Sequence, residues 1–195
     1  MKKDKFTVRD LVNAGLFSVL VLAAVWVSGM IGFLPITMPI VPFVCTFVAG
    51  PVFMLYSTRI KRFGMLLIMG IIFGAAFSAS GHGIYVFPGI VIVTLIGEYI
   101  LKMGDYNSIK HARWAYTVFA LFAGANLLPL YISRESYYKA LVESGYGVEY
   151  ADKLMTYLPT WSFVPVVLFG CLGAYLGAGL GIKILNKHFK SAGMV

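Results

Sequence analysis

The chain has 195 residues, of which 59% are hydrophobic and only 12% are charged, and its mean hydropathy is +0.84. Soluble domains are about half apolar and a quarter charged, so this composition excludes an ordinary soluble protein and predicts one embedded in lipid. The net charge of +8 would suggest nucleic acid in a soluble domain. Here the basic residues flank hydrophobic runs, which indicates membrane topology signals and no nucleic-acid partner.

Six long uncharged runs predict six transmembrane helices, because a bilayer core of about 30 Å takes about 20 apolar residues per helix. The predicted spans are 11–33, 39–56, 64–79, 84–101, 114–132 and 161–185. They leave only short loops, so we expect one transmembrane domain over residues 1–195 and an all-α, compact six-helix bundle. The hydrophobicity comes in several blocks and not in one short run, so no cleaved targeting segment is expected.

The basic residues are distributed unevenly between the two sides of the predicted membrane. Thirteen of the 16 lie on the side of the two termini: Lys2, Lys3, Lys5, Arg9, Arg59, Lys61, Arg62, Lys102, Lys110, Arg113, Lys183, Lys187 and Lys190. The other three, Arg134, Lys139 and Lys153, follow the fifth span, where acidic residues outnumber them. Lys and Arg in short loops stay in the cytoplasm, so we expect both termini to be cytoplasmic.

The segment 133–160 is too long and too regularly patterned to be a plain connector. Apolar residues recur at helical spacing on both sides of Gly145 and Gly147, which predicts two short amphipathic helices in an outer loop between the fifth and sixth spans. These helices either cap a cavity between the spans or lie in the headgroup region. Arg134 and Glu135 at the start of the segment are interpreted as solvated loop charges.

Small residues four positions apart predict close helix packing. Gly173, Gly177 and Gly181 form such a stripe in the last span, either for packing within the chain or, less favoured, for a partner subunit. Ala14 and Ser18 have the same spacing in the first span.

Sequence features of catalysis and of metal binding are missing. The chain has no G-x-x-x-x-G-K-[ST] phosphate loop, and Cys45 and Cys171 have no neighbours at metal-ligand spacing. Glu98 is the single carboxylate within a predicted span, and its position four residues before Lys102, near the cytoplasmic end, predicts an ion pair or snorkelling to the interface. We therefore expect no enzyme activity, no catalytic residue, no metal site and no cofactor of its own.

The remaining polar groups gather on the side opposite the termini: His82, Tyr85, Asn126, Tyr131 and Trp161. A few polar groups among aromatic residues are typical of a site for a small solute. Two of them have an equally simple structural interpretation, because His82 could bond a loop carbonyl and Asn126 could bond across helices.

Several features together carry a resemblance to a known class of protein. A six-span chain with a basic amino terminus, small residues four apart in the first helix and a long loop before the last helix resembles the S components of energy-coupling factor (ECF) transporters, the substrate-binding subunits of bacterial vitamin and micronutrient importers. The stretches 32–36 (GFLPI), 80–83 (SGHG) and 143–152 (ESGYGVEYAD) resemble the Trep_Strep family, which has been proposed to consist of S components.

The resemblance implies a subunit of the bacterial cell membrane that binds a small micronutrient, vitamin-like or a precursor, from outside. Its partners would be a transmembrane coupling subunit and two cytoplasmic ATPase subunits, which alone use ATP. The ligand would lie under the loops between spans one and two, three and four, and five and six, which selects Pro35, Met38, His82, Tyr85, Asn126, Tyr131 and Trp161. Ala14 and Ser18 would contact the coupling subunit. No amino-terminal Met-His motif is present, which disfavours a metal substrate.

Two other classes of function remain open at this point. A stand-alone secondary transporter or channel would show inverted repeats or helices broken in the middle of the membrane, and no convincing repeat is found. A membrane enzyme is disfavoured by the missing acid and base groups.

Overall fold

The computed structural model describes residues 6–191, with side chains described for residues 6–187. Every regular element in this range is helical. Six helical segments are long and apolar enough to cross a membrane: Val8–Phe33, Pro35–Ser57, Met65–His82, Val86–Met103, Ile109–Ile132 and Thr160–Lys187. The predicted fold class, an all-α membrane bundle with six spans, is therefore confirmed.

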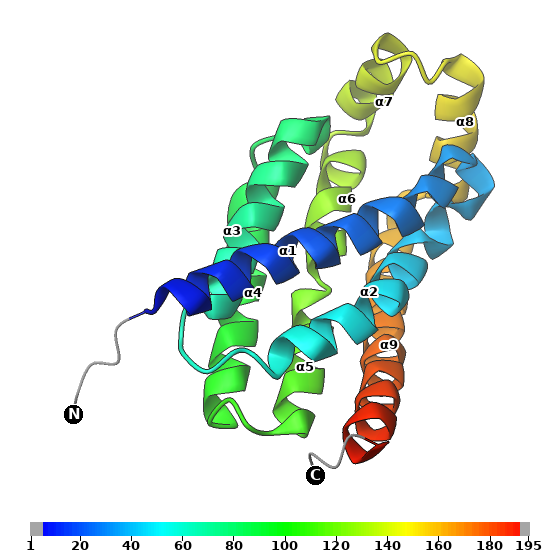
Figure 1. Cartoon of the computed structure of the whole chain (residues 1–195). Coiled ribbons are helices and arrows are strands. Elements are labelled where there is room, and N and C mark those ends of the chain that lie inside the picture. Colours follow the sequence, from blue (N-terminus) through cyan, green and yellow to red (C-terminus); the bar gives the residue numbers. More distant parts are fainter. Residues whose placement is uncertain (1–5, 192–195) are drawn as a thin grey trace.

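The bundle has two distinct ends (Figure 1). The main helices are α1 (Val8–Gly29), α2 (Val41–Ser57), α3 (Met65–Phe77), α4 (Val86–Met103), α5 (Ile109–Phe119), α6 (Phe122–Ile132), α7 (Arg134–Glu143), α8 (Val148–Tyr157) and α9 (Phe163–Ser191). The short α7 and α8 form one end, which we call the α7–α8 end, whereas α1 begins and α9 ends near the opposite end. Short helical turns η1 (Met30–Phe33), η2 (Pro35–Ile40), η3 (Ser78–His82) and η4 (Thr160–Ser162) join the spans at the α7–α8 end.

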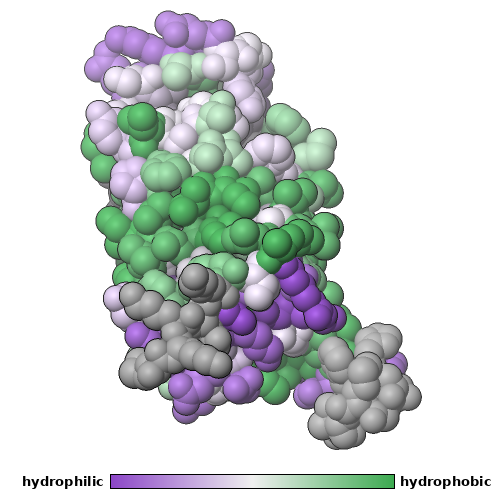
Figure 2. All heavy atoms as spheres, turned by 60° about the vertical axis from the view of Figure 1, so that its left-hand side comes forward, coloured by the Kyte–Doolittle hydropathy of each residue, from purple (hydrophilic) through white to green (hydrophobic). Residues whose placement is uncertain are grey.

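The surface matches a membrane location. Figure 2 shows a hydrophobic band across the visible face, with hydrophilic residues above and below it. Large apolar side chains in the middle of the spans are exposed, among them Leu16, Ile92 and Leu168. In a bilayer these side chains contact lipid. Of the basic residues used to predict orientation, Lys2, Lys3 and Lys5 lie outside the described residues, as does the side chain of Lys190.

The predicted orientation can be tested with introduced cysteines. In a protein with Cys45 and Cys171 replaced by Ala, a cysteine at Ser144 is expected to react with an impermeant thiol reagent from outside intact cells, and one at Asn107 only after the membrane is opened. Both positions are exposed. Asn107 is preferred to Ser108, whose side chain caps α5. The reverse labelling pattern would overturn the orientation.

The glycine stripe of the last span packs inside the chain. α9 lies along α2, and a Cβ atom at Gly173 or Gly177 would overlap the carbonyl oxygen of Phe43 or Phe47. The hydroxyl of Thr46 on α2 lies 2.7 Å from the carbonyl oxygen of Gly170 on α9. The two helices therefore meet backbone to backbone, and the interpretation of the stripe as packing within the chain accounts for these residues.

Two irregular segments shape the α7–α8 end. The fifth span is interrupted between α5 and α6, at Ala120 and Leu121. The third span ends in η3, where Gly81 and Gly83 have φ values of +92° and +86° that other residues rarely adopt. These glycines turn the chain sharply into α4, as the glycine-rich stretch predicts.

Glu98 does not pair with Lys102, so that prediction is wrong. Its side chain is fully buried, and Oε2 accepts a hydrogen bond of 2.9 Å from the N–H of Leu67 in the first turn of α3. The ammonium group of Lys102 lies instead 5.8 Å from the ring centre of Phe63. The N-terminus of a helix presents unpaired N–H groups and a positive dipole end, so the carboxylate from α4 is stabilised there.

Ala14 and Ser18 are both fully buried within the chain. α1 crosses the bundle obliquely and packs on α2 and α3 (Figure 1). The hydroxyl of Ser18 donates a hydrogen bond of 2.5 Å to the carbonyl oxygen of Ala14. A contact of these two residues with a coupling subunit stays a prediction, and it would require α1 to separate from the helices on which it packs.

Candidate functional site

A cavity of about 500 Å³ lies inside the α7–α8 end of the bundle. Its walls come from α1, α2 and α6, and from the connections between spans one and two, three and four, and five and six. The volume falls within the usual range of small-molecule sites in proteins.

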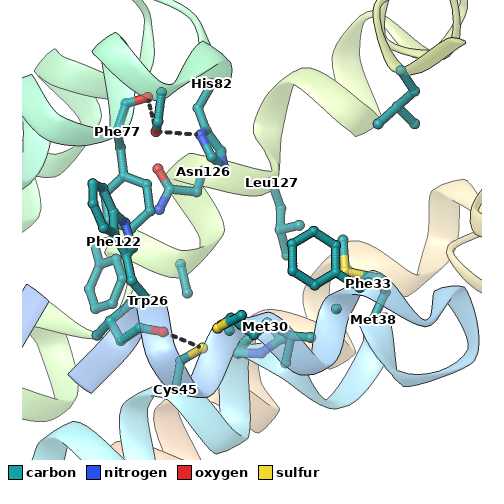
Figure 3. A pocket seen from close by; sticks show the side chains of 18 of the residues that line it. Trp26, Met30, Phe33, Met38, Cys45, Phe77, His82, Phe122, Asn126 and Leu127 are labelled. Carbon is teal, nitrogen blue, oxygen red and sulfur yellow. Dashed lines mark hydrogen bonds between the residues drawn. The ribbon is translucent and has the colours of Figure 1, made fainter. Parts of the chain in front are cut away.

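The lining is aromatic, sulfur-containing and aliphatic with a few polar groups. The residues are Val25, Trp26, Gly29, Met30, Gly32, Phe33, Met38, Val41, Pro42, Cys45, Phe77, Ser80, His82, Phe122, Ala123, Asn126, Leu127, Tyr137, Leu141, Tyr146 and Tyr150. No Asp, Glu, Lys or Arg is among these described residues. Figure 3 shows His82 and Asn126 towards one side of the cavity and Phe33 and Met38 towards the other.

His82 is held at the cavity by the η3 turn. Its ring lies edge-on to Phe77, with the ring centres 5.3 Å apart and the planes at 86°. Its Nδ1 lies 3.2 Å from Oγ of Ser80, whose hydroxyl donates to the carbonyl oxygen of Phe77 (Figure 3). The turn histidine therefore has a local hydrogen-bond partner and also faces the cavity, so the two interpretations of this residue are compatible.

Asn126 reaches the cavity from α6, which starts just after the interruption of the fifth span. Its Oδ1 atom is buried and has no hydrogen-bond partner among the described residues. The hydrogen bond across helices that its position allows is therefore not made by this oxygen. Because this oxygen is itself buried, Asn126 meets the cavity through other atoms of the residue.

Three of the seven predicted ligand-binding residues line this cavity: Met38, His82 and Asn126. The other four lie outside it. Tyr85 and Trp161 are 82% and 74% exposed, and Pro35 begins η2 without facing the cavity. The hydroxyl of Tyr131 shares a hydrogen bond of 2.8 Å with Ser162. Tyr131 thus ties α6 to the start of the last span.

We call residues 134–157, which comprise α7, α8 and the turn between them, the roof of the cavity. Tyr137, Leu141, Tyr146 and Tyr150 of this segment line the cavity. The two amphipathic helices thus cap a cavity, which is one of the two arrangements that the sequence allows. Gly145 and Gly147, with φ of +88° and +85°, form the turn between α7 and α8.

Side-chain hydrogen bonds hold the roof in place. The hydroxyl of Tyr150 on α8 donates a bond of 2.7 Å to the carbonyl oxygen of Gly32 in η1. Burial raises the pKa of Tyr150 to about 12, so this donor keeps its proton throughout the physiological range. The guanidinium of Arg134 donates to the carbonyl oxygens of Leu158 and Met155 at the end of α8. Arg134 is therefore a helix cap, which corrects its interpretation as a solvated loop charge.

A second, smaller hydrophobic cluster joins the roof to α6 and α9, apart from the main core of the bundle. It consists of buried Leu130, Leu154, Leu158 and Val166, with Met38, Leu127, Tyr131, Tyr137, Leu141, Tyr150 and Met155 packed against them. The main core is built around aromatic residues of α2, α3, α5 and α6, including Phe53, Phe73, Tyr116 and Phe119.

Several lining residues are absent from the predicted set, notably Trp26, Phe33, Cys45 and Tyr150. Trp26 lies in the middle of an apolar run, where an aromatic residue is more often core or lipid-facing. The sequence pattern does indicate Tyr150 as a candidate lining residue, because it falls on the apolar face of a short amphipathic helix. Its partner, the backbone of Gly32, is 118 residues away in the chain.

The fold defines an all-helical integral membrane protein, with a cavity whose described lining residues carry no Asp, Glu, Lys or Arg. Among the described residues no cluster of three or more His, Cys, Asp or Glu side chains is placed to hold a metal ion. Residues 8–191 match the model of the Trep_Strep family, described as hypothetical bacterial integral membrane proteins, and the chain belongs to this family. No curated protein and no solved structure matches the chain.

Proposed function

We propose that this chain is the S component of an ECF-type importer, a subunit that captures a small micronutrient outside the cell and delivers it through a coupling module. The observation that supports this most directly is the position of the cavity. It lies under the connections between spans one and two, three and four, and five and six, where the resemblance to S components places the ligand.

In this proposal the chain binds solute and performs no catalysis. Its sequence carries no phosphate loop, so the energy for uptake comes from two cytoplasmic ATPase subunits, joined to it by a transmembrane coupling subunit. The subunit lies in the bacterial plasma membrane with both termini in the cytoplasm and the α7–α8 end outside. It needs no cofactor and binds no nucleic acid.

The interruption of the fifth span bears on the alternative of a stand-alone carrier. The fifth span is interrupted near its middle, and broken helices of carriers expose backbone carbonyls that bind ions. Here the interruption remains hydrogen-bonded, since the N–H of Leu121 donates to Val118 and that of Ala123 donates to Ala120. The break is a tightened, hydrogen-bonded turn, so it favours the alternative only weakly.

Affinity purification from the native host tests the proposal. A tagged chain extracted in mild detergent is expected to bring down a membrane coupling subunit and two ATPases. Proteoliposomes that contain the whole complex should accumulate the small molecule that co-purifies with the chain when ATP is supplied. Proteoliposomes that contain the chain alone should not. Accumulation by the chain alone, driven by an ion gradient, would establish the carrier instead.

A further inference from the structure

The cavity is only partly enclosed, and the exposed part of its wall belongs mainly to α1 and η1. Lining residues of α2 and α6, such as Cys45 and Phe122, are buried. Trp26, Met30 and Phe33 also line the cavity, but they are 48%, 60% and 61% exposed. They follow one another along α1 and η1, across the cavity from η3 (Figure 3). One edge of the cavity is therefore a row of exposed apolar side chains.

The helices leave this flank of the bundle open. α1 packs on α2 and α3, and Trp26 still meets Phe77 of α3, with ring centres 6.5 Å apart. Beyond Trp26, α1 leans away from α3 towards the α7–α8 end (Figure 1). Within residues 6–191, neither α6 nor η3 is among the elements on which α1 packs closely. The cavity thus has an opening on the side of the bundle between η1 and η3, which we call the side opening.

The roof closes the cavity towards the α7–α8 end. Tyr137, Leu141 and Tyr150 line the cavity and are only partly exposed. The hydrogen bond from Tyr150 to the backbone of Gly32 fastens α8 to η1. Tyr146 is the one exposed residue among the described lining residues of the roof, and its ring packs 5.0 Å from that of Tyr150. The side opening is therefore the longer exposed edge of the cavity.

The side opening lies at the depth of the membrane. The turns next to it expose large apolar side chains, namely Leu34, Ile36 and Ile84. Such side chains are unfavourable in water, which indicates that the hydrocarbon reaches these turns. The span that includes α1 and η1 has 26 residues, about 39 Å of helix, and must tilt to fit a hydrocarbon core of about 30 Å. Its oblique course is that tilt (Figure 1).

A charged molecule finds no partner of opposite charge in the cavity. No Asp, Glu, Lys or Arg is among its described lining residues. The nearby charges of the roof are engaged elsewhere, because Arg134 caps α8 and Asp152 accepts a hydrogen bond of 2.9 Å from Tyr138. An ion entering this space would lose its hydration without compensation. The same reason disfavours a phospholipid headgroup, which carries a phosphate.

We infer that the cavity opens sideways into the lipid between η1 and η3 and takes an uncharged, lipid-soluble small molecule from the leaflet at the α7–α8 end. This inference rests on the proposed function, since it names the class of solute for the same cavity and its route of entry. With the predicted orientation, that leaflet is the outer one. A volume of about 500 Å³ suits a drug-sized molecule, and the aromatic walls offer it a large apolar contact area.

Tryptophan fluorescence tests where the side opening leads. Trp114→Phe and Trp161→Phe leave Trp26 as the single tryptophan. In vesicles of phosphatidylcholine with brominated acyl chains, Trp26 is expected to lose most of its fluorescence, whereas iodide in the water should quench it little. The control replaces Trp26 by Phe as well and adds Tyr146→Trp at the edge of the roof, where iodide should be the stronger quencher. Stronger quenching of Trp26 by iodide than by brominated lipid would place the side opening in water and overturn the inference.

Three probes test the class of molecule that binds. 2-Methoxynaphthalene is uncharged and lipid-soluble, naphthalene-2-sulfonate carries a negative charge on the same ring system, and nicotinamide is uncharged but soluble in water. Equilibrium dialysis against the protein in nanodiscs, corrected for empty nanodiscs, gives the three affinities. 2-Methoxynaphthalene is expected to bind about 100-fold more tightly than the anion and about tenfold more tightly than nicotinamide.

A matched pair of substitutions ties this binding to the cavity. Ala123 lines the cavity from α6, so Ala123→Leu should fill part of it and weaken the binding of 2-methoxynaphthalene about tenfold. Ala23→Leu, at an exposed position of α1 that does not line the cavity, should leave the affinity unchanged. If thermal unfolding shows that Ala123→Leu does not fold, the comparison of the three probes on the unaltered protein decides.

The inference is overturned if naphthalene-2-sulfonate or nicotinamide binds as tightly as 2-methoxynaphthalene, or if 2-methoxynaphthalene shows no saturable binding. Unchanged binding by a folded Ala123→Leu variant also overturns it. None of these results touches the proposed function, because an S component whose solute enters from water would still co-purify with ATPases and support ATP-driven uptake. Conversely, the expected quenching and binding without co-purifying ATPases would support the inference and refute the assignment as an S component.

Discussion

Gly177→Ala is expected to lower the melting temperature of the purified protein markedly, and Gly177→Leu is expected to prevent folding. A Cβ atom at this position would overlap the carbonyl of Phe47, and one at the facing Gly50 would overlap the backbone of Gly177 itself. Backbone atoms cannot rotate out of the way as side chains can. We therefore expect a cost near the upper end of the usual range for overpacking, about 3 kcal/mol for alanine.

Gly15→Ala is the matched control for this prediction. Gly15 is also inside a transmembrane helix, but a Cβ there would have no neighbour within 4 Å. Alanine has a higher helix propensity than glycine by about 1 kcal/mol, so this variant should be as stable as the parent or slightly more stable. The measurement is thermal unfolding followed by size-exclusion chromatography. Equal melting temperatures for Gly177→Ala and Gly15→Ala would contradict backbone contact between α2 and α9.

Glu98→Ala is expected to destabilise the protein by about 2–3 kcal/mol. The carboxylate is fully buried and accepts the N–H of Leu67 at the start of α3. Removing it leaves a partly buried donor unpaired and removes a negative charge from the positive end of the helix dipole. Glu98→Gln keeps an oxygen acceptor at the same place, so its loss of stability should be smaller.

Lys102→Ala separates this role from an ion pair within α4. The ammonium group of Lys102 lies near the ring of Phe63 and is exposed, so its removal should change stability by less than about 1 kcal/mol. If Lys102→Ala costs as much as Glu98→Ala, the two residues act as a pair, and the helix-capping role of Glu98 is wrong. Neither variant should alter binding in the cavity, which neither residue lines.

The overall architecture could be predicted from the sequence because it depends on local properties. Uninterrupted apolar runs set the six spans, and the apolar spacing around Gly145 and Gly147 sets α7 and α8. The bilayer removes most alternatives, since a backbone in lipid must satisfy its hydrogen bonds within a helix or a closed barrel. Length and hydropathy are then sufficient to place the helices.

The site could be predicted only in part, because its residues depend on how helices face one another. His82 and Asn126 could be selected since they are rare polar groups near one end of the spans. Trp26 and Cys45 could not, because nothing local distinguishes a cavity wall from a lipid-facing or core residue. Position along the chain selects Trp161 and Tyr85 as well, but their side chains are exposed and do not line the cavity.

Glu98 also shows that local sequence does not determine the tertiary contacts of a residue. Its spacing to Lys102 is the pattern of a helical ion pair, and within α4 alone that is the simplest interpretation. The stronger partner is the first turn of α3, which comes near only after the bundle has formed. A sequence pattern reports the neighbours within a helix, whereas a buried carboxylate is stabilised by whichever donors the tertiary structure supplies.

The small cluster under the roof is separate from the main hydrophobic core, and this separation has a consequence for motion. Leu154 and Leu158 of the roof cluster can lose their contacts while the aromatic cluster around Phe73 and Phe119 stays packed. Regions of a protein that do not share buried contacts can open independently, each with its own free energy. We therefore expect the backbone amide protons of α7 and α8 to exchange through openings that leave the transmembrane helices intact. Exchange with solvent can then reach the cavity without unfolding of the protein.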